Sequence, residues 1–226
     1  MDQQQQSKRL AGEAAAKLVK DGMKVGLGTG STIYFTIMRL IERVHEEGLR
    51  IQCIPTSEST RELAERGGIP MTSFASVDHL DLVLDGADEV DPQLNLIKGG
   101  GGALLREKLV ALAGDSFIIV ADASKQVEQL GEFPLPVEMV PFAYETTLRR
   151  MQAIGLSPQL RMQDNQPFIT DNGNLIATCH CGRILDPAAL HNQLKAITGV
   201  VETGLFVGMA ESAIVSDGRI VWEVTR

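Results

Sequence analysis

One stretch decides the fold of this chain of 226 residues: Leu82-Val83-Leu84-Asp85-Gly86-Ala87-Asp88. It opens with a continuous apolar run, which is typical of a strand buried on both faces of a parallel sheet. It ends in two carboxylates, and ligands of open parallel sheets bind beyond the carboxyl ends of the strands. The stretch therefore predicts an α/β fold with Asp85 and Asp88 at its binding edge.

Strands and helices alternate on both sides of this stretch. Short apolar runs predict further strands at 24–28, 51–54 and 117–120. Apolar residues at helical spacing predict helices at 7–20, 33–47 and 58–66. This alternation predicts a Rossmann-like, mostly parallel sheet with helices on both faces. Gln3 to Gln6 are interpreted as a short frayed tail before the first helix.

A different pattern follows in the second half of the chain. Strands and helices are predicted there in the order β-α-β-β-α-β, and Asp171-Asn172-Gly173 adds the signal of a hairpin turn. The last hairpin, at 213–224, is expected to return to the first sheet. We therefore expect a Rossmann-like catalytic domain from residues 1–131 and 204–226, and a smaller ferredoxin-like α+β domain from residues 132–203.

The composition argues against several classes of protein. A net charge of −8 at pH 7 argues against a nucleic-acid-binding role, which a basic surface favours. No apolar run is long enough to span a membrane, and the amino terminus does not resemble a secretory signal. Three cysteines at this length make no disulfide framework. We therefore expect a cytoplasmic protein with no nucleic-acid or membrane partner.

A glycine-rich turn, Gly28-Thr29-Gly30-Ser31-Thr32, follows the first predicted strand and precedes a helix. This arrangement directs backbone N–H groups and the helix N-terminus at an anion. It is not a Walker loop, because no lysine follows the last glycine, and it is a poor dinucleotide fingerprint. A sugar phosphate therefore fits the turn better than NAD does. The alternative is a tight turn in which Ser31 or Thr32 caps the helix.

A second glycine-rich segment, Lys98-Gly99-Gly100-Gly101-Gly102, follows the carboxylates. Asp85 and Asp88 are suited to hold sugar hydroxyls or to relay a proton, whereas Glu89 and Asp91 are expected to be solvated. Lys98 and the N–H groups after it are suited to stabilise an oxyanion. The alternatives are a solvated acidic turn and a surface lysine. No magnesium site is expected, because the spacing matches no calcium loop and Lys98 competes for the carboxylates.

Glu107 is the residue that we expect to move a proton. Its neighbours one helical turn away are Ala103, Val110 and Ala111, so the carboxylate lies on a small apolar stripe. A carboxylate placed there loses solvation, and its pKa rises toward the range of a general base. The alternative is an ordinary glutamate on a helix surface.

Other polar residues give weaker signals. Lys125 follows a predicted strand and Lys8 lies in the first helix, so both are candidates to contact a phosphate, with a solvated lysine as the alternative. Cys179-His180-Cys181 suggests a metal site. On a strand, however, His180 points away from the two cysteines, and no second ligand pair follows at zinc spacing. No metal or cofactor is therefore predicted.

As a set, these motifs closely resemble type A ribose-5-phosphate isomerase. The resemblance covers nearly the whole chain and is carried by Gly28–Thr32, Asp85–Asp88, Lys98–Gly102, Arg106-Glu107-Lys108 and Glu202-Thr203-Gly204-Leu205-Phe206. It implies that the chain interconverts D-ribose 5-phosphate and D-ribulose 5-phosphate through a cis-enediolate, in the non-oxidative pentose phosphate pathway. It also implies that no cofactor or metal is needed and that the protein is a homodimer.

The resemblance assigns a role to each motif. It implies catalytic roles for Glu107, which moves the proton between C2 and C1, and for Asp85, Asp88 and Lys98. It implies that substrate is bound by Thr29, Gly30, Ser31, Thr32, Asp85, Gly86, Ala87, Asp88, Lys98, Gly99, Gly100, Gly101, Lys125 and Lys8.

Two rival functions remain to be distinguished from the isomerase. A sugar-phosphate-sensing regulator domain would normally carry a DNA-binding helix-turn-helix, and no basic recognition helix is present in this sequence. A coenzyme A transferase also uses a glutamate near a glycine loop, and it would show a thioester intermediate. Formation of ketose from ribose 5-phosphate distinguishes the isomerase from both rivals.

Overall fold

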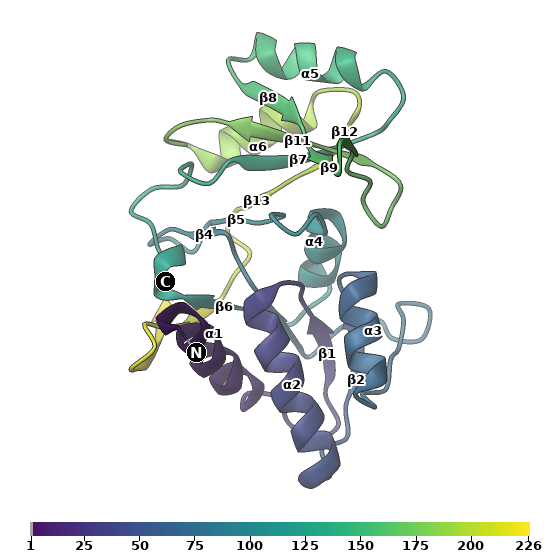
Figure 1. Ribbon diagram of the computed structural model, residues 1–226, viewed down its shortest axis with the longest axis vertical. Helices are drawn as coiled ribbons and strands as arrows, with labels where there is room; N and C mark the ends of the chain where they lie inside the picture. Colours follow the sequence, from purple (N-terminus) through teal and green to yellow (C-terminus); the bar gives the residue numbers. More distant parts are fainter. Residues whose placement is uncertain (1) are drawn as a thin grey trace. The chain divides into compact units, whose positions relative to one another are not determined.

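The computed structural model describes residues 2–226, which fall into two compact units (Figure 1). The first unit comprises Met1–Ala87, Arg106–Gln126 and Met209–Arg226, and the second comprises Asp88–Leu105 and Val127–Gly208. The chain therefore passes from one unit to the other four times. The second unit takes in a segment, Asp88–Leu105, that the boundaries expected from the sequence do not give it.

A six-stranded sheet forms the centre of the first unit. Its strands are β1 (Lys24–Leu27), β2 (Gln52–Pro55), β3 (Leu82–Asp85), β6 (Phe117–Asp122), β14 (Ser212–Ser216) and β15 (Val221–Thr225). Their order is β15-β14-β6-β3-β1-β2, and all neighbours are parallel except β14 and β15. The mostly parallel sheet is confirmed, and so is the return of the last hairpin to it.

Helices cover both faces of this sheet. They are α1 (Gln3–Ala16), α2 (Ser31–Glu46), α3 (Glu58–Arg66) and α4 (Leu104–Leu112). Val25 and Leu27 of β1 belong to the core that α1, α2 and α3 share, whereas a side chain at Gly26 would meet Val110 of α4. Successive residues of a strand point to opposite faces, so α4 covers the face opposite to the other three helices.

The ferredoxin-like arrangement predicted for the second half of the chain is also confirmed. The second unit contains, in chain order, β7 (Leu135–Met139), α5 (Tyr144–Ala153), β8 (Ser157–Leu160), β11 (Leu175–His180), α6 (Pro187–Lys195) and β12 (Val200–Thr203). These strands form an antiparallel sheet of order β12-β7-β11-β8. A short hairpin of β9 (Met162–Gln163) and β10 (Gln166–Pro167) is inserted between β8 and β11.

A small three-stranded sheet completes the second unit. It consists of β4 (Glu89–Val90), β5 (Leu96–Ile97) and β13 (Leu205–Phe206), in the order β13-β5-β4. Both partners of β5 pair with it in antiparallel fashion. The sheet thus brings the segment before the glycine run next to a segment more than a hundred residues later, at residues 205–206.

The amino-terminal glutamines do not form a frayed tail, as we had expected from the sequence. They form the first turns of α1, because Asp2 caps the helix and its side chain accepts a hydrogen bond from the Gln5 N–H group (2.7 Å). Within residues 2–226, no helix combines the length and the apolar character that crossing a membrane requires.

The expectation that Glu89 and Asp91 are solvated is also wrong, since both are buried. Glu89 accepts hydrogen bonds from the N–H groups of Gly131 (2.6 Å) and Phe133. Asp91 accepts a hydrogen bond from the Asn95 N–H group (2.8 Å). Both carboxylates therefore satisfy backbone donors of neighbouring loops, which offsets the cost of their burial.

Candidate active site

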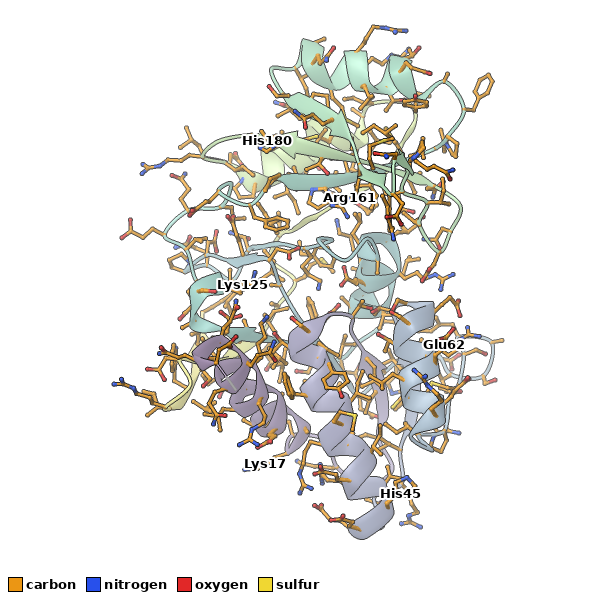
Figure 2. The ribbon with its side chains drawn as sticks, in the orientation of Figure 1. Lys17, His45, Glu62, Lys125, Arg161 and His180 are labelled. Atoms are coloured by element: carbon orange, nitrogen blue, oxygen red, sulfur yellow. The ribbon has the colours of Figure 1, made fainter. Side chains whose placement is uncertain are left out.

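Three elements of the predicted site lie at one edge of the first unit's sheet. The strands β1, β3 and β6 are parallel, so their carboxyl ends lie at the same edge. Thr29–Thr32 follow β1, and Asp85 ends β3. Lys125 ends the short 3₁₀ helix η1 (Ala123–Lys125) that follows β6 (Figure 2). Carboxyl edges of this kind are where α/β proteins bind ligands.

Lys8 lies in α1. Its neighbour Ser7 lines a cavity of about 360 Å³ together with Asp122 and Ser124. Ser124 lies in η1 directly before Lys125, and Asp122 caps this helix, since its carboxylate accepts a hydrogen bond from the Ser124 N–H group (3.2 Å). The two lysines predicted from separate parts of the sequence thus belong to neighbouring elements.

The turn Gly28–Thr32 leads into α2, and no side chain caps this helix. Side chains do cap α1, α3 and α6, which begin after Asp2, Ser57 and Asp186. Among the residues that the structure describes, the first three N–H groups of α2 have no acceptor. The alternative in which Ser31 or Thr32 caps the helix is therefore wrong, and these donors are available to an anion.

Buried hydroxyl groups of the segment 56–60 form hydrogen bonds with the turn Gly28–Thr32. The Thr29 Oγ1 atom lies 2.7 Å from Oγ1 of Thr56, 2.8 Å from Oγ of Ser57 and 3.2 Å from Oγ1 of Thr60. Thr60 also donates a hydrogen bond to the carbonyl oxygen of Gly28 (2.9 Å). Thr56, Ser57 and Thr60 are 0%, 6% and 4% exposed, so water competes little for these bonds. Sequence reasoning missed this hydroxyl cluster.

Asp85 ties the end of β3 to the same turn. Its Oδ1 atom accepts hydrogen bonds from the N–H groups of Thr29 (3.1 Å) and Gly86 (2.7 Å), and the residue is fully buried. A Cβ atom at Gly28 would collide with this carboxylate, so only glycine fits at that position. The position of Asp85 therefore fixes the start of the glycine-rich turn.

The second unit holds Asp88 and the glycine run. The Asp88 N–H group donates to the carbonyl oxygen of Ile97 (2.8 Å), and its Oδ2 atom accepts from the Gly100 N–H group (2.7 Å). The Lys98 side chain is buried, and its Nζ atom lies 5.5 Å from the centre of the Phe206 ring. The face of an aromatic ring attracts a cation. The segment at 202–206, which shares in the sequence resemblance, thus supports Lys98.

Arg161 also contacts the glycine run, and sequence reasoning missed it. Its Nη1 atom donates hydrogen bonds to the carbonyl oxygens of Gly99 (3.1 Å) and Gly100 (3.2 Å). The residues lie 62 and 61 positions apart in the chain, and no local pattern around Arg161 indicates the contact. Only the pairing of the second unit's strands brings them together.

Glu107 lies in the first turn of α4 and is 5% exposed. Val110 and Ala111 beside it on the helix are also buried, as the apolar stripe predicts. The preceding residue, Arg106, instead forms an ion pair with Glu58 at the start of α3 (2.7 Å), which lowers the pKa of Glu58. Glutamate is seldom this deeply buried, so the position of Glu107 needs an explanation.

The cysteines of Cys179-His180-Cys181 are poor metal ligands. Burial raises the pKa of Cys179 to about 12 and that of Cys181 to about 11, so both thiols are protonated at neutral pH. One group in the described residues, His79, Asp81 and Asp115, brings three ligand atoms within 4.8 Å of one another. His79 and Asp81 precede β3, and Asp115 precedes its parallel neighbour β6. Asp85 ends β3, so the group lies at the opposite end of these strands from the candidate site.

Comparison with known proteins identifies the family. The sequence profile of Ribose 5-phosphate isomerase A (phosphoriboisomerase A) matches residues 52–219. The chain belongs to the ribose 5-phosphate isomerase A family. It is 56% identical to ribose-5-phosphate isomerase A of Bacillus mycoides (strain KBAB4) over 209 residues, which cover 92% of this chain and 94% of that protein. It is 47% identical to the Bradyrhizobium diazoefficiens protein of the same name over 232 residues, covering 98% and 96%.

Solved structures of ribose 5-phosphate isomerases have the same fold. The Plasmodium falciparum enzyme has a TM-score of 0.93 at 36% identity, covering 100% of this chain and 99% of that one. A D-ribose-5-phosphate isomerase in complex with phospho-erythronic acid has a TM-score of 0.94 at 38% identity, covering 97% of each chain. This family member is therefore an aldose–ketose isomerase of ribose 5-phosphate and ribulose 5-phosphate.

Proposed function

We propose that Glu107 moves the proton in the interconversion of D-ribose 5-phosphate and D-ribulose 5-phosphate. Its carboxylate takes the proton from C2 of the open-chain aldose, electrons move to the carbonyl oxygen on C1, and a cis-enediolate forms. Transfer of the O2 proton to O1 and return of the Glu107 proton to C1 give the ketose. The observation that carries this assignment is the 5% exposure of Glu107, because a carboxylate that has lost water is a stronger base.

Lys98 and the glycine run stabilise the enediolate in this proposal. The Lys98 ammonium group is buried, where charge interacts more strongly than in water. A fixed cation and fixed N–H groups need no rearrangement when the oxyanion forms, which is the source of their catalytic effect.

Asp88 and Asp85 have different roles in the proposal. Asp88 is partly exposed, and one of its oxygens accepts the Gly100 N–H bond, so we assign Asp88 to proton exchange with the sugar hydroxyls and to ring opening. Asp85 is fully buried and accepts the Thr29 and Gly86 N–H bonds. We assign Asp85 mainly to holding the Thr29–Thr32 turn in place.

The phosphate group is assigned to the first unit. The uncapped N-terminus of α2 supplies N–H donors, and Ser31 and Thr32 add hydroxyl groups. Lys8 and Lys125 supply positive charge from α1 and η1, two elements that line one cavity. A dianionic phosphate is better matched to this set than a neutral group is.

The substitution Glu107→Gln tests the central assignment. We expect turnover of ribose 5-phosphate, measured as ketose formation in the presence of EDTA, to fall by about 10²–10⁴-fold or more. Glu128→Gln, which changes an exposed glutamate, is the matched control and should keep full activity. A folded Glu107→Gln protein with near-normal turnover would refute the role of Glu107.

The same preparation tests the two rival functions. A sensor domain would bind ribose 5-phosphate without forming ketose. A coenzyme A transferase would accumulate a thioester that hydroxylamine cleaves. We expect turnover and no thioester, and the opposite pair of results would exclude the isomerase.

We further propose that the protein is a cytoplasmic homodimer. The second unit leaves the large apolar side chains of Phe142 and Leu185 89% and 85% exposed, and exposed apolar groups of this size favour contact with a partner. Light scattering coupled to gel filtration should give twice the chain mass of 24.5 kDa. A mass equal to one chain at micromolar concentration would exclude the dimer, and cell fractionation tests the location.

A further inference from the structure

The glycine run after Lys98 is held on one side by a single cation. Arg161 lies between β8 and β9 (Figure 2), and its backbone is fixed at both polar groups. Its N–H group donates to the carbonyl oxygen of Ile176 (2.8 Å), and its carbonyl oxygen accepts from the Phe168 N–H group (2.9 Å). Among residues 2–226, the side chain of Arg161 hydrogen-bonds only to the carbonyl oxygens of Gly99 and Gly100.

These two bonds set the orientation of two consecutive peptide planes. No peptide bond in the described residues is cis, and in a planar trans peptide the C=O and N–H groups point in opposite directions. The N–H groups of Gly100 and Gly101 therefore point away from Arg161. The first of them donates to the Asp88 carboxylate (2.7 Å), as this orientation requires.

The second N–H group, that of Gly101, has no acceptor within the described residues. Two successive N–H groups that point to the same side make a concavity that binds anions. The Gly100 N–H group already donates to Asp88, so the Gly101 N–H group is the donor that remains for a ligand. It lies three residues after Lys98, which the proposed function places on the enediolate.

The guanidinium group is itself held in place. Its carbon lies 5.8 Å from the centre of the Phe168 ring, in cation–π geometry. Burial lowers the pKa of Arg161, and the nearby Asp88 opposes this shift. The ordinary arginine pKa exceeds about 12, so the group is charged at neutral pH. The partly buried guanidinium group of Arg161 thus donates its side-chain hydrogen bonds to two carbonyl oxygens of the glycine run.

We propose that Arg161 is a positioning residue of the isomerase, which orients the glycine run so that the Gly101 N–H group stabilises the enediolate oxygen. The inference rests on the proposed role of Lys98–Gly101. Arg161 itself does not touch the substrate. Its loss therefore weakens binding of the transition state more than binding of the ground state.

The kinetics of Arg161→Met and Arg161→Ala test this inference. The methionine keeps much of the apolar stem and removes the charge. Each variant should lower kcat by about 10²-fold, the effect of losing one oxyanion donor, and change KM by less than about threefold. Inhibition by phospho-erythronic acid, whose carboxylate resembles the enediolate, should weaken in parallel with kcat.

Chemical rescue separates positioning from a general loss of structure. Millimolar guanidinium chloride should raise kcat of Arg161→Ala in a saturable manner, whereas sodium chloride at equal ionic strength should not. Arg183→Ala, which removes an exposed arginine of the same unit, should have normal kinetics and show no response. If Arg161→Ala does not fold, the kcat and KM of Arg161→Met decide the question alone.

Two results overturn the inference. One is an unchanged kcat in folded Arg161→Met. The other is a loss of kcat that guanidinium does not restore in folded Arg161→Ala. Lys98→Met separates this failure from failure of the proposed function. If Lys98→Met is fully active, the glycine run is not the oxyanion site, whereas an inactive Lys98→Met beside a fully active Arg161→Met refutes the positioning role only.

Discussion

Two glycine-rich turns of this isomerase look alike in sequence but are held by different chemistry. Gly28–Thr32 in the first unit is fixed by buried hydroxyl groups and by the Asp85 carboxylate, whereas Lys98–Gly102 in the second unit is fixed by an aspartate and by a cation, Arg161. In the proposed function, these supports leave the positive end of helix α2 free for a phosphate that carries its charge throughout the reaction. The cation Arg161 instead orients the loop at which, in the same proposal, charge appears only in the transition state.

The comparison predicts that changes in the first turn raise KM and changes in the second lower kcat. A binding interaction present in both the ground state and the transition state affects KM, and one present only in the transition state affects kcat. Three substitutions test this division, and a fourth tests an ion pair beside Glu107; they follow from the largest expected effect to the smallest.

Lys98→Met should have the largest effect. Removal of the buried ammonium group should lower kcat by about 10²–10³-fold, because the oxyanion loses a fixed charge. Lys20→Met, at an exposed lysine, is the control. Steady-state kinetics would contradict the comparison if KM rose and kcat did not change.

Gly102→Ala should both unfold more easily and turn over more slowly. The φ angle of Gly102 is +85°, and a Cβ atom would lie 2.5 Å from Cζ of Phe168. We expect a loss of about 1–3 kcal/mol in the free energy of unfolding, measured in urea. Gly173 has a φ angle of +77°, and no atom lies within 4 Å of a Cβ built there. Gly173→Ala therefore measures the cost of the backbone conformation alone, and we expect a smaller loss in its free energy of unfolding. Equal losses would show that the Phe168 contact is unimportant.

Thr60→Val should have a smaller effect, on binding. The buried carbonyl oxygen of Gly28 loses its donor, which should cost about 1–2 kcal/mol in the free energy of unfolding. KM for ribose 5-phosphate should rise several-fold while kcat stays within about twofold. Thr60→Ser keeps the hydroxyl group and should behave like the parent chain. A fall in kcat alone would break the proposed division between the two turns.

Arg106→Met should have the smallest effect. Its ion pair with Glu58 is partly exposed, and such pairs contribute about 0.2–1 kcal/mol. The pair lowers the pKa of Glu58 in the folded state, so its stabilisation is present above the ordinary glutamate pKa of about 4.3 and is lost as the pH falls through the lowered value. The free energy of unfolding in urea should be lower for Arg106→Met than for the parent chain at pH 7, and the two should be equal at strongly acidic pH. A difference that persists in acid would mean that Arg106 acts by packing.

The sequence predicts best those features that depend on neighbouring residues. The helix at 58–66 begins and ends as expected because Ser57 caps it and Gly67 follows it. The carboxyl edge of the sheet is likewise predictable, since apolar runs that end in polar turns place Thr29 and Asp85 there. The apolar stripe around Glu107 predicts its burial by the same local reasoning.

Features that depend on distant partners are not predictable in this way. Glu89 looks solvated in sequence because its donors, such as the Gly131 N–H group, lie more than forty positions away. The contacts of Arg161 with the glycine run and of Phe206 with Lys98 depend on strand pairing that no local pattern encodes. The hydroxyl cluster around Thr29 needs the register between β1 and β2.

The four passages of the chain between the units have a consequence for how this enzyme can be divided. Neither unit is a continuous piece of polypeptide, so no single cut yields either of them whole, and neither can be transplanted into another protein by joining one gene segment. The passage at 87–88 falls inside the Asp85–Asp88 motif, and the passage at 105–106 directly precedes the Arg106–Lys108 motif. An insertion or deletion at either point would shift the proposed catalytic residues Asp88 or Glu107 directly. These two passages therefore have the least room to vary in length.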